Sequence, residues 1–578
     1  MAGGSWTTWV LRRRVVVLVS GLVLLGCFWW LEIGWGDLVP KDRGRALAGE
    51  FFSKALAPAM DFEGEGLVRE GTFLGKVAGT LWLTFRFALV AVSLALVVGF
   101  FGALLATKGW WGRARWQFRL LRAAVRGLAT FLRSIHELLW ALLFLAALGT
   151  TPAAAITALA LPYLGTFTKI FSEILDEAPG SAARVTAAGG ATGLVTALVL
   201  VWQALPDLWS YALYRLECAV RSSAVLGFVG VPTTGYEIAT AFEDGHYREI
   251  WTHLYALLGL VLVLEVLGAR VRQKLTEGVT GGAFLEGASL LERWKKRGKS
   301  GFLRVVGWGG VGLTAWCWLQ PFEFGSSLSW KRRVTNLGRF VEDLAPAPLR
   351  DGGGWGDVMD WAGQLLAESG WEAIGRTLAL GTAAALLAGG IALGVMPWAS
   401  RQLPSSQPWQ TVVGGRPWRK VAARGLQGGS MVGRALPEFL LAFLLLQLFG
   451  PTVWPLILAL VIHNGGILVR LGAEITDNVP RVVPQVTLSA GSGRLVTFLG
   501  GVLPQIFNRL LLFLFYRWET CLREATVLGV LGVASMGALI AESRARLRYD
   551  ELLFWMLMGA GLVVMADLVS EAVRRRLR

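Results

Sequence analysis

Ionisable side chains recur in pairs inside otherwise apolar stretches of this sequence. Arg133 precedes Glu137 by four residues, and Arg434 precedes Glu438 by the same spacing. On a helix, residues four apart share one face. A charge inside a bilayer costs about 2.5–3.5 kcal/mol on insertion scales, so such residues mark a functional site by default. We expect a polar face that lines a pathway, and the alternative is an ion pair that only locks helices together.

A second polar group lies near the end of a later apolar run in each half of the chain. It comprises Tyr214, Arg215, Glu217, Arg221 and Ser222, with Tyr516, Arg517, Glu519 and Arg523 at the matching places. The planar guanidinium of arginine matches two anionic oxygens at once. The alternative is an interfacial anchor, because tyrosine and arginine also favour the headgroup zone. Their repetition favours a gate or cavity lining.

The chain contains an internal repeat. Residues 133–144 (RSIHELLWALLF) align with residues 434–445 (RALPEFLLAFLL), and residues 221–227 (RSSAVLG) align with residues 523–529 (REATVLG). Charged residues that recur in register within apolar surroundings are hard to obtain by chance. We therefore predict two homologous halves, with a first half 1–270 (core 80–270), a linker 271–301 and a second half 302–578 (core 375–578).

Composition indicates a polytopic membrane protein. Of 578 residues, 54% are hydrophobic and 17% are charged, and the mean hydropathy is +0.53. A bilayer crossing needs about 20 apolar residues. The predicted spans are 15–33, 80–106, 127–149, 152–171, 194–216, 251–269, 302–321, 375–397, 433–450, 452–471, 495–516 and 552–570. The fold class is thus all-α, with about twelve membrane helices arranged as two parallel-repeat bundles of six, and a pathway is expected on the pseudo-two-fold axis between parallel repeats.

The basic residues set the orientation. The segments 108–122 and 398–433 carry five Lys or Arg residues each and no acid. Since cytoplasmic loops are enriched in Lys and Arg, both segments and both termini are predicted to be cytoplasmic. The formal net charge is +16, and its Lys and Arg residues lie mainly between apolar runs, where they orient membrane helices. We therefore expect no nucleic-acid partner.

A polar stretch of similar design follows the fourth span of each half. In the first half it contains Glu173, Asp176, Ala188 and Gly189, and in the second half it contains Glu474, Asp477, Gln485 and Gly491. Each stretch is predicted to hold a short helix and a glycine break on the cytoplasmic side. Two such elements at equivalent places favour docking to a soluble partner.

Several catalytic and metal motifs are missing from the sequence. It has no phosphate-binding loop of the G-x-x-x-x-G-K-[ST] type, no CxxC pair and no HExxH motif. We expect neither a catalytic residue nor a metal nor a cofactor in this chain. If its work depends on ATP, the ATP and Mg²⁺ must be held by separate subunits.

The repeated strings resemble the permeases of phosphonate-type ABC importers. They include residues 221–230 (RSSAVLGFVG), residues 214–217 (YRLE) and residues 516–519 (YRWE). The resemblance covers roughly 80–270 and 375–578. It implies a type I permease fold in the bacterial inner membrane, alternating access, two ATP-binding cassette subunits and an extracytoplasmic binding protein. It also implies that 173–193 and 474–495 are coupling helices for the ATPases. The glutamate that is usual in that loop is replaced by Ala183 in the first half and by Gln485 in the second half.

Other functions remain open at this point. The cargo is expected to be a phosphonate or related phosphorus oxyanion, with phosphate, phosphite or an amino acid as alternatives. A polytopic membrane enzyme that uses Glu137 or Glu438 as an acid–base group is a further alternative. It is disfavoured because enzymes rarely duplicate an acid–base set together with two docking loops.

Overall fold

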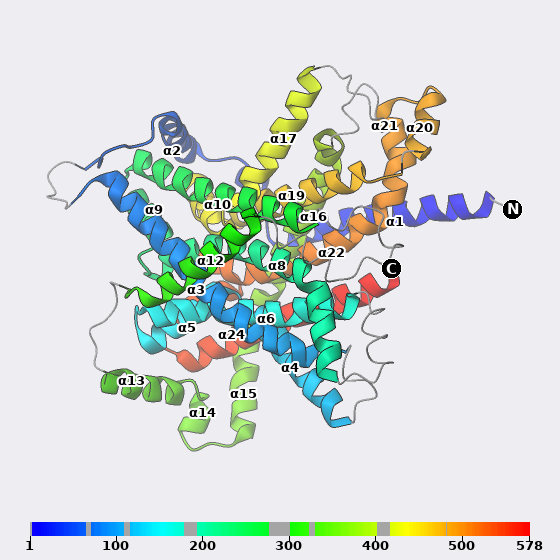
Figure 1. Ribbon diagram of the computed structural model, residues 1–578. Helices are drawn as coiled ribbons and strands as arrows, with labels where there is room; N and C mark the ends of the chain where they lie inside the picture. The colour runs from blue at the N-terminus through cyan, green and yellow to red at the C-terminus, as the bar shows by residue number, and fades with distance from the viewer. Residues whose placement is uncertain are drawn as a thin grey trace. The chain divides into compact units, whose positions relative to one another are not determined.

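The computed structural model describes residues 3–64, 71–108, 116–178, 193–276, 301–322, 330–400, 417–480 and 482–577 (Figure 1). Every regular element in these ranges is helical. The chain divides into two compact units, and each is described by itself. Unit 1 comprises Met1–Phe52 and Val341–Arg578, and unit 2 comprises Ser53–Phe340.

The long helices of unit 2 come mainly from the first half of the sequence. They are α3 (Phe73–Ala106), α4 (Trp116–Ser134), α5 (Glu137–Leu148), α6 (Pro152–Glu177), α8 (Gly193–Val225), α9 (Thr234–Glu243), α10 (Tyr247–Thr276) and α12 (Gly301–Leu319). Helix α6 is central, since it packs against α3, α4, α5 and α8.

Unit 1 repeats this plan with the second half of the sequence. Its helices are α1 (Gly3–Trp30), α15 (Trp355–Leu365), α16 (Trp371–Ala399), α17 (Pro417–Ala435), α18 (Glu438–Phe449), α19 (Trp454–Asp477), α20 (Val482–Ser489), α21 (Arg494–Thr497), α22 (Leu503–Leu528), α23 (Met536–Ala545) and α24 (Tyr549–Leu577). Helix α19 takes the place of α6 and packs against α16, α17, α18 and α22. The shorter helices are α2 (Asp42–Ser53), α13 (Trp330–Asp343) and α14 (Ala347–Arg350).

The membrane-crossing helices agree with the sequence prediction. Within the described residues, eight helices are long and apolar enough to cross a membrane, or up to 11 if each of three bent helix pairs is one span. Helix α8, which overlaps the predicted span 194–216, lies outside that set. Together with α8, these segments fall on the twelve predicted spans.

The third predicted span of each half is a broken helix. Helices α4 and α5 meet at 86°, and α17 and α18 meet at 94°. In the second half the break precedes Pro437, which has no N–H and disfavours a helical conformation in the residue before it. In the first half His136 makes the break, because its Nδ1 accepts the Leu138 N–H at 3.2 Å and caps α5.

The break corrects one sequence expectation. Arg133 and Arg434 lie in the last turn of α4 and α17, whereas Glu137 and Glu438 are the first residues of α5 and α18. The two residues of each pair therefore do not share one helix face. Each carboxylate instead lies at a helix N-terminus, where the helix dipole favours a negative charge.

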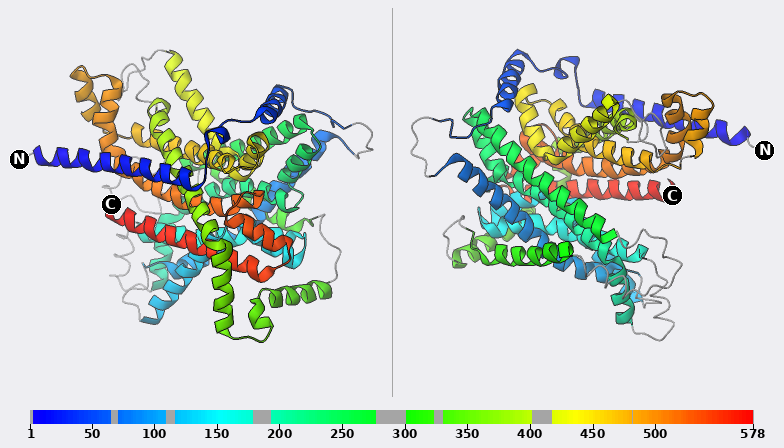
Figure 2. Two further views of the ribbon diagram at one scale, coloured as in Figure 1. Left: turned by 180° about the vertical axis from the view of Figure 1, so that it is seen from behind. Right: turned by 45° about the horizontal axis from the view of Figure 1, so that its top comes forward.

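The first helix of each half packs on the body that belongs to the other half. Helix α1 contacts α16 in unit 1, and α12 contacts α3 in unit 2 (Figure 2). In unit 2, Arg86 Nε and Nη2 each donate to the Cys317 carbonyl at 3.1 Å, at the end of α12. In unit 1, Arg376 approaches Glu32 at 3.8 Å, just beyond the end of α1. Each compact unit therefore contains the first helix of one half of the sequence and the main helices of the other half.

Close backbone contacts place the central helices. A Cβ on Gly165 of α6 would lie 2.4 Å from the Ala129 carbonyl oxygen, and a Cβ on Gly466 of α19 would lie 2.6 Å from that of Ser430. Only glycine lets α6 approach α4, and α19 approach α17, this closely. The two glycines occupy equivalent places of the repeat, so both units build the same helix crossing.

Candidate functional site

The polar residues of unit 2 gather around Glu137, at the start of α5. Ser222 of α8 donates to Glu137 Oε1, and its Oγ also lies 3.2 Å from the Tyr163 hydroxyl of α6. His136 Nδ1 is 3.8 Å from Glu137 Oε2. Because that nitrogen accepts the Leu138 N–H, it carries no proton and forms no ion pair with Glu137. Three helices thus converge on one buried carboxylate.

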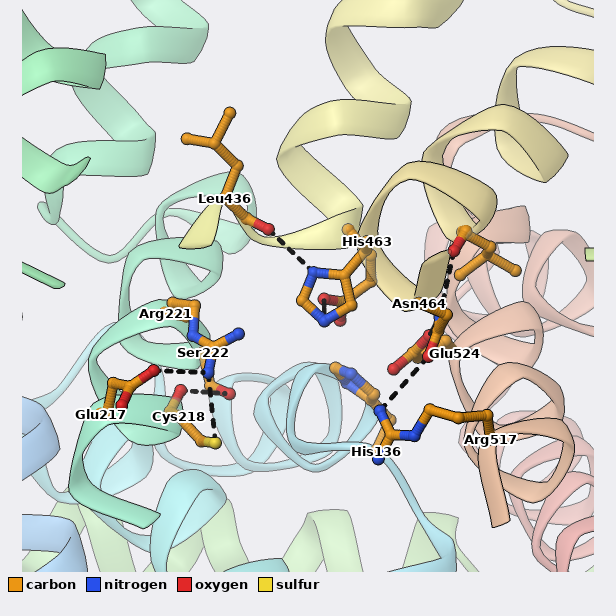
Figure 3. A network of polar contacts seen from close by, with 12 residues as sticks. His136, Glu217, Cys218, Arg221, Ser222, Leu436, His463, Asn464, Arg517 and Glu524 are labelled. Atoms are coloured by element: carbon orange, nitrogen blue, oxygen red, sulfur yellow. Dashed lines mark hydrogen bonds and ion pairs between the residues drawn. The ribbon is translucent and has the colours of Figure 1, made fainter. Parts of the chain in front are cut away.

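The arginines of α8 are held within their own helix. Arg221 Nη2 lies 3.4 Å from Glu217 Oε1 and 3.3 Å from Cys218 Sγ (Figure 3). Arg215 Nε donates to the Tyr211 hydroxyl at 2.7 Å, and its guanidinium lies 5.6 Å from the Tyr214 ring centroid. Glutamate and aromatic neighbours therefore orient both arginines.

The matching residues of unit 1 gather around two carboxylates. Glu524 of α22 accepts the Asn464 Nδ2 at 2.9 Å, and Arg517 Nη1 donates to Asn464 Oδ1 at 3.3 Å. His463 of α19 places its Nε2 3.9 Å from Glu438 Oε2. Figure 3 shows the imidazole of His463 with its other nitrogen toward the Leu436 carbonyl.

Repeat alignment shows what differs between the two groups. Position by position, Glu137, Tyr163 and Ser222 of unit 2 correspond to Glu438, Asn464 and Glu524 of unit 1. The shared carboxylate faces a hydroxyl partner in unit 2 and a second carboxylate in unit 1. The same helix arrangement therefore places different functional groups beside the shared carboxylate in the two units.

The remaining predicted pathway residues lie on α8 and α22 or, as for Arg133 and Arg434, in the last turn of α4 and α17. Glu217 and Glu519 are buried, as are Arg434 and Arg517. Tyr516 is 37% exposed and lies 5.2 Å from the Arg517 guanidinium. Helix α8 continues to Val225, past the predicted span end at 216, so the cluster lies within the helix.

Part of the predicted coupling stretch is described. In the second half, Gln485 lies on the short helix α20, and Gly491 just beyond it has a φ of +83°. A left-handed backbone there favours glycine, so the expected short helix and glycine break are present. Glu474 pairs with Arg470 at 3.0 Å, and Asp477 ends α19.

In the first half, Glu173 and Asp176 end α6. Asp176 accepts the Lys108 N–H at 2.6 Å and Arg126 Nη2 at 2.9 Å, so it ties α6 to the end of α3 and to α4. Ala188 and Gly189 lie outside the described residues. The coupling role of all these residues remains a prediction.

Sequence reasoning missed the residues that complete the two clusters. Tyr163, His463, Asn464 and Glu524 were not among the predicted site residues, although each is a polar residue within or beside an apolar run. The internal repeat could have indicated them, because each of the four residues lies on a helix that carries, or contacts, a predicted site residue. A buried carboxylate such as Glu524 is expensive in a membrane and could have been selected for that reason.

Comparison with known proteins now defines the class. Residues 411–578 match the family described as the inner membrane component of binding-protein-dependent transport systems. The chain is 27% identical over 458 residues to the phosphate-import permease protein PhnE of Mycolicibacterium smegmatis, covering 79% of this chain and 76% of the relative. No solved structure gives a significant match. The class is therefore the permease of an ABC importer, a transport component and not an enzyme.

Two further relatives refine this. The phosphite transport system permease protein PtxC of Stutzerimonas stutzeri is 29% identical over 269 residues, which are 90% of that protein but 46% of this chain. A cryptic phosphonate transport system permease protein PhnE2 of Escherichia coli is 29% identical over 118 residues, covering 20% of this chain and 97% of the relative. The chain is thus similar to permeases of the phosphonate and phosphite type.

Proposed function

We propose that this chain conducts a phosphorus oxyanion across the bacterial cytoplasmic membrane by alternating access, with both termini on the cytoplasmic side. The relatives are named as permeases for phosphate, phosphite and phosphonate. These anions share a tetrahedral phosphorus and at least two anionic or protonated oxygens. The phosphite permease PtxC matches 46% of this chain over 90% of its own length. A chain that holds two such halves would need no second permease copy.

The observation that carries this proposal is the repeated polar cluster. Both units place an arginine, Arg221 or Arg523, next in sequence to a residue that takes part in the cluster around Glu137 or Glu438. Arginine binds an oxyanion with two parallel hydrogen bonds, and a carboxylate accepts the P–OH hydrogen bond that sulfate cannot donate. Such a set favours protonated phosphorus oxyanions over sulfate and over neutral nutrients.

Transport measurements test the cargo. The chain is expressed with its cognate ATPase and binding protein in cells without other phosphate or phosphonate importers. We expect uptake of labelled phosphate or phosphite, and competition by methylphosphonate but not by sulfate or glutamine. Competition by an amino acid and by none of the phosphorus anions would overturn the proposal.

The energy supply is proposed to come from two separate ATP-binding cassette subunits on the cytoplasmic side, with a binding protein on the outer side. Support comes from the family of binding-protein-dependent transport components and from the short helix α20 with its glycine break. The Mg²⁺ and ATP would then reside on those subunits. Purified chain alone should hydrolyse no ATP.

Labelling tests the orientation. In a variant without native cysteines, Glu173→Cys and Glu474→Cys should both react with a membrane-impermeant maleimide only in inverted vesicles. Reaction of either residue in intact cells would reject the cytoplasmic placement of these loops.

A further inference from the structure

Three potential metal ligands converge in unit 1. They are Glu438 at the start of α18, His463 on α19 and Glu524 on α22, and their ligand atoms all lie within 4.8 Å of one another. Two carboxylates and one imidazole are a common ligand set for zinc and for other divalent transition metals. The residues come from three helices, so a bound ion would cross-link the centre of this unit.

The histidine is already oriented as a ligand. His463 Nδ1 lies 3.0 Å from the Leu436 carbonyl oxygen. A carbonyl cannot donate, so Nδ1 carries the proton, and the Nε2 of a neutral ring then has a lone pair. A hydrogen bond from the other ring nitrogen to a carbonyl is the usual outer support of a metal-binding histidine.

The lone pair of His463 faces a carboxylate. Nε2 is 3.9 Å from Glu438 Oε2, and two acceptors at this distance repel unless a cation lies between them. A proton on Nε2 would join the histidine to one carboxylate. A metal ion joins all three donors, and ligand atoms around tetrahedral zinc lie roughly 3.3–3.6 Å apart, so a contraction of a few tenths of an ångström brings His463 and Glu438 to that distance.

Neighbouring residues support the second carboxylate. Asn464 donates to Glu524 Oε2 at 2.9 Å, which fixes one oxygen and orients the group. Arg517 donates to the Asn464 oxygen, and its positive charge reduces the affinity for a cation. The side chain of Glu438 keeps 16% of its surface exposed, which gives an ion an approach to the cluster.

We propose that Glu438, His463 and Glu524 form a binding site for one divalent transition-metal cation, with Zn²⁺, Mn²⁺ or Co²⁺ as the candidate ions. Unit 2 cannot form it, because Ser222 stands at the place of Glu524 and Pro162 stands at the place of His463. The site shares Glu438 with the cluster of the proposed function, but it is tested separately, since metal binding can be measured on the purified chain without transport.

Cobalt binding to the full chain tests the proposal. The chain is purified in detergent without a histidine tag, freed of metal with a chelator and titrated with Co²⁺. We expect one ion per chain with the visible absorption bands of a low-coordinate site, and displacement by Zn²⁺. His463→Gln and Glu524→Gln should each weaken binding at least tenfold. Glu137→Gln, which changes the equivalent carboxylate of unit 2, should leave binding unchanged.

Two outcomes would overturn the site. One is the absence of stoichiometric binding, which would leave a protonated His463 paired with Glu438. The other is binding that His463→Gln and Glu524→Gln do not alter, which shows adventitious ions elsewhere. If Glu524→Gln fails to give a monodisperse protein, Glu438→Gln replaces it, because Glu438 is partly exposed at a helix end and its loss disturbs packing less.

Discussion

The two units share a helix plan but differ in the chemistry at its centre. Around the shared carboxylate, unit 2 supplies Tyr163 and Ser222, which have hydroxyl groups, whereas unit 1 supplies Asn464 and Glu524 at the matching positions. A permease assembled from two copies of one chain must present the same residues twice. A single chain that carries both halves is free of that constraint, so the two clusters can differ while the helix crossings stay the same.

The largest effect on uptake is expected when the matching arginine is removed from each unit. Arg221→Ala together with Arg523→Ala should abolish uptake, and each single change should lower it at least tenfold, because a bidentate anion contact is lost. Uptake at saturating and limiting concentrations separates binding from turnover. The matched control is Arg546→Ala, which removes an exposed arginine paired with Glu542 and should leave uptake unchanged. Normal uptake in the double variant would show that both arginines are anchors.

A second test concerns the coupling stretch of the second half. Gly491→Pro should lower ATP-dependent uptake at least tenfold while membrane insertion stays intact, since proline fixes φ near −65° and Gly491 has a φ of +83°. Gly493→Ala is the control, because a Cβ there meets no atom within 4 Å and its φ is not left-handed. Uptake equal to that of the unchanged chain would reject α20 as a coupling element.

A third test makes the two clusters alike. Ser222→Glu places a second carboxylate beside Glu137 without the amide that orients Glu524. We expect a loss of at least about 2 kcal/mol of stability, because a buried charge is left without a partner. Thermal unfolding in detergent measures it, and Ser222→Ala, which removes only a hydrogen bond, should lose about 1 kcal/mol. Equal unfolding temperatures for the Glu and Ala variants would mean that unit 2 also tolerates paired carboxylates.

A fourth test compares the residues that anchor the first helix of each half, and it includes the smallest expected effect. Arg86 is buried and donates to the Cys317 and Pro321 carbonyls at 3.0–3.1 Å, so Arg86→Gln should cost about 2–3 kcal/mol. Arg376→Gln should cost at most about 1 kcal/mol, since Glu32 is 79% exposed at 3.8 Å. Unfolding temperatures of the two variants compare the anchors directly, and the reverse order would contradict this account.

The sequence allowed the helices to be predicted better than the site. Apolar runs of about 20 residues and basic loops suffice to find the spans, and the repeat located Glu137, Glu438 and the arginines. The bend before Glu137 could not be predicted, because it depends on a capping histidine and not on proline. His463, Asn464 and Glu524 were also missed, since their importance comes from three helices converging in space.

Glycines at matching places give the two units the same chain path beside clusters of different chemistry. Gly230 and Gly532 both have a left-handed φ, at +94° and +92°, and both follow the shared Val-Leu-Gly string. The glycines fix the path of the chain, which depends on main-chain geometry. The side chains of the clusters are free to change once that path is fixed.

The exchange of first helices has a consequence for how such a chain can be made. A polypeptide cut between residues 277 and 300 would leave α1 on one fragment and the body that α1 covers on the other, with α12 in the reverse situation. Neither fragment could bury its own surfaces alone. Each half of the sequence therefore depends on the other half for a helix that covers its body, and the two halves must be made together to fold.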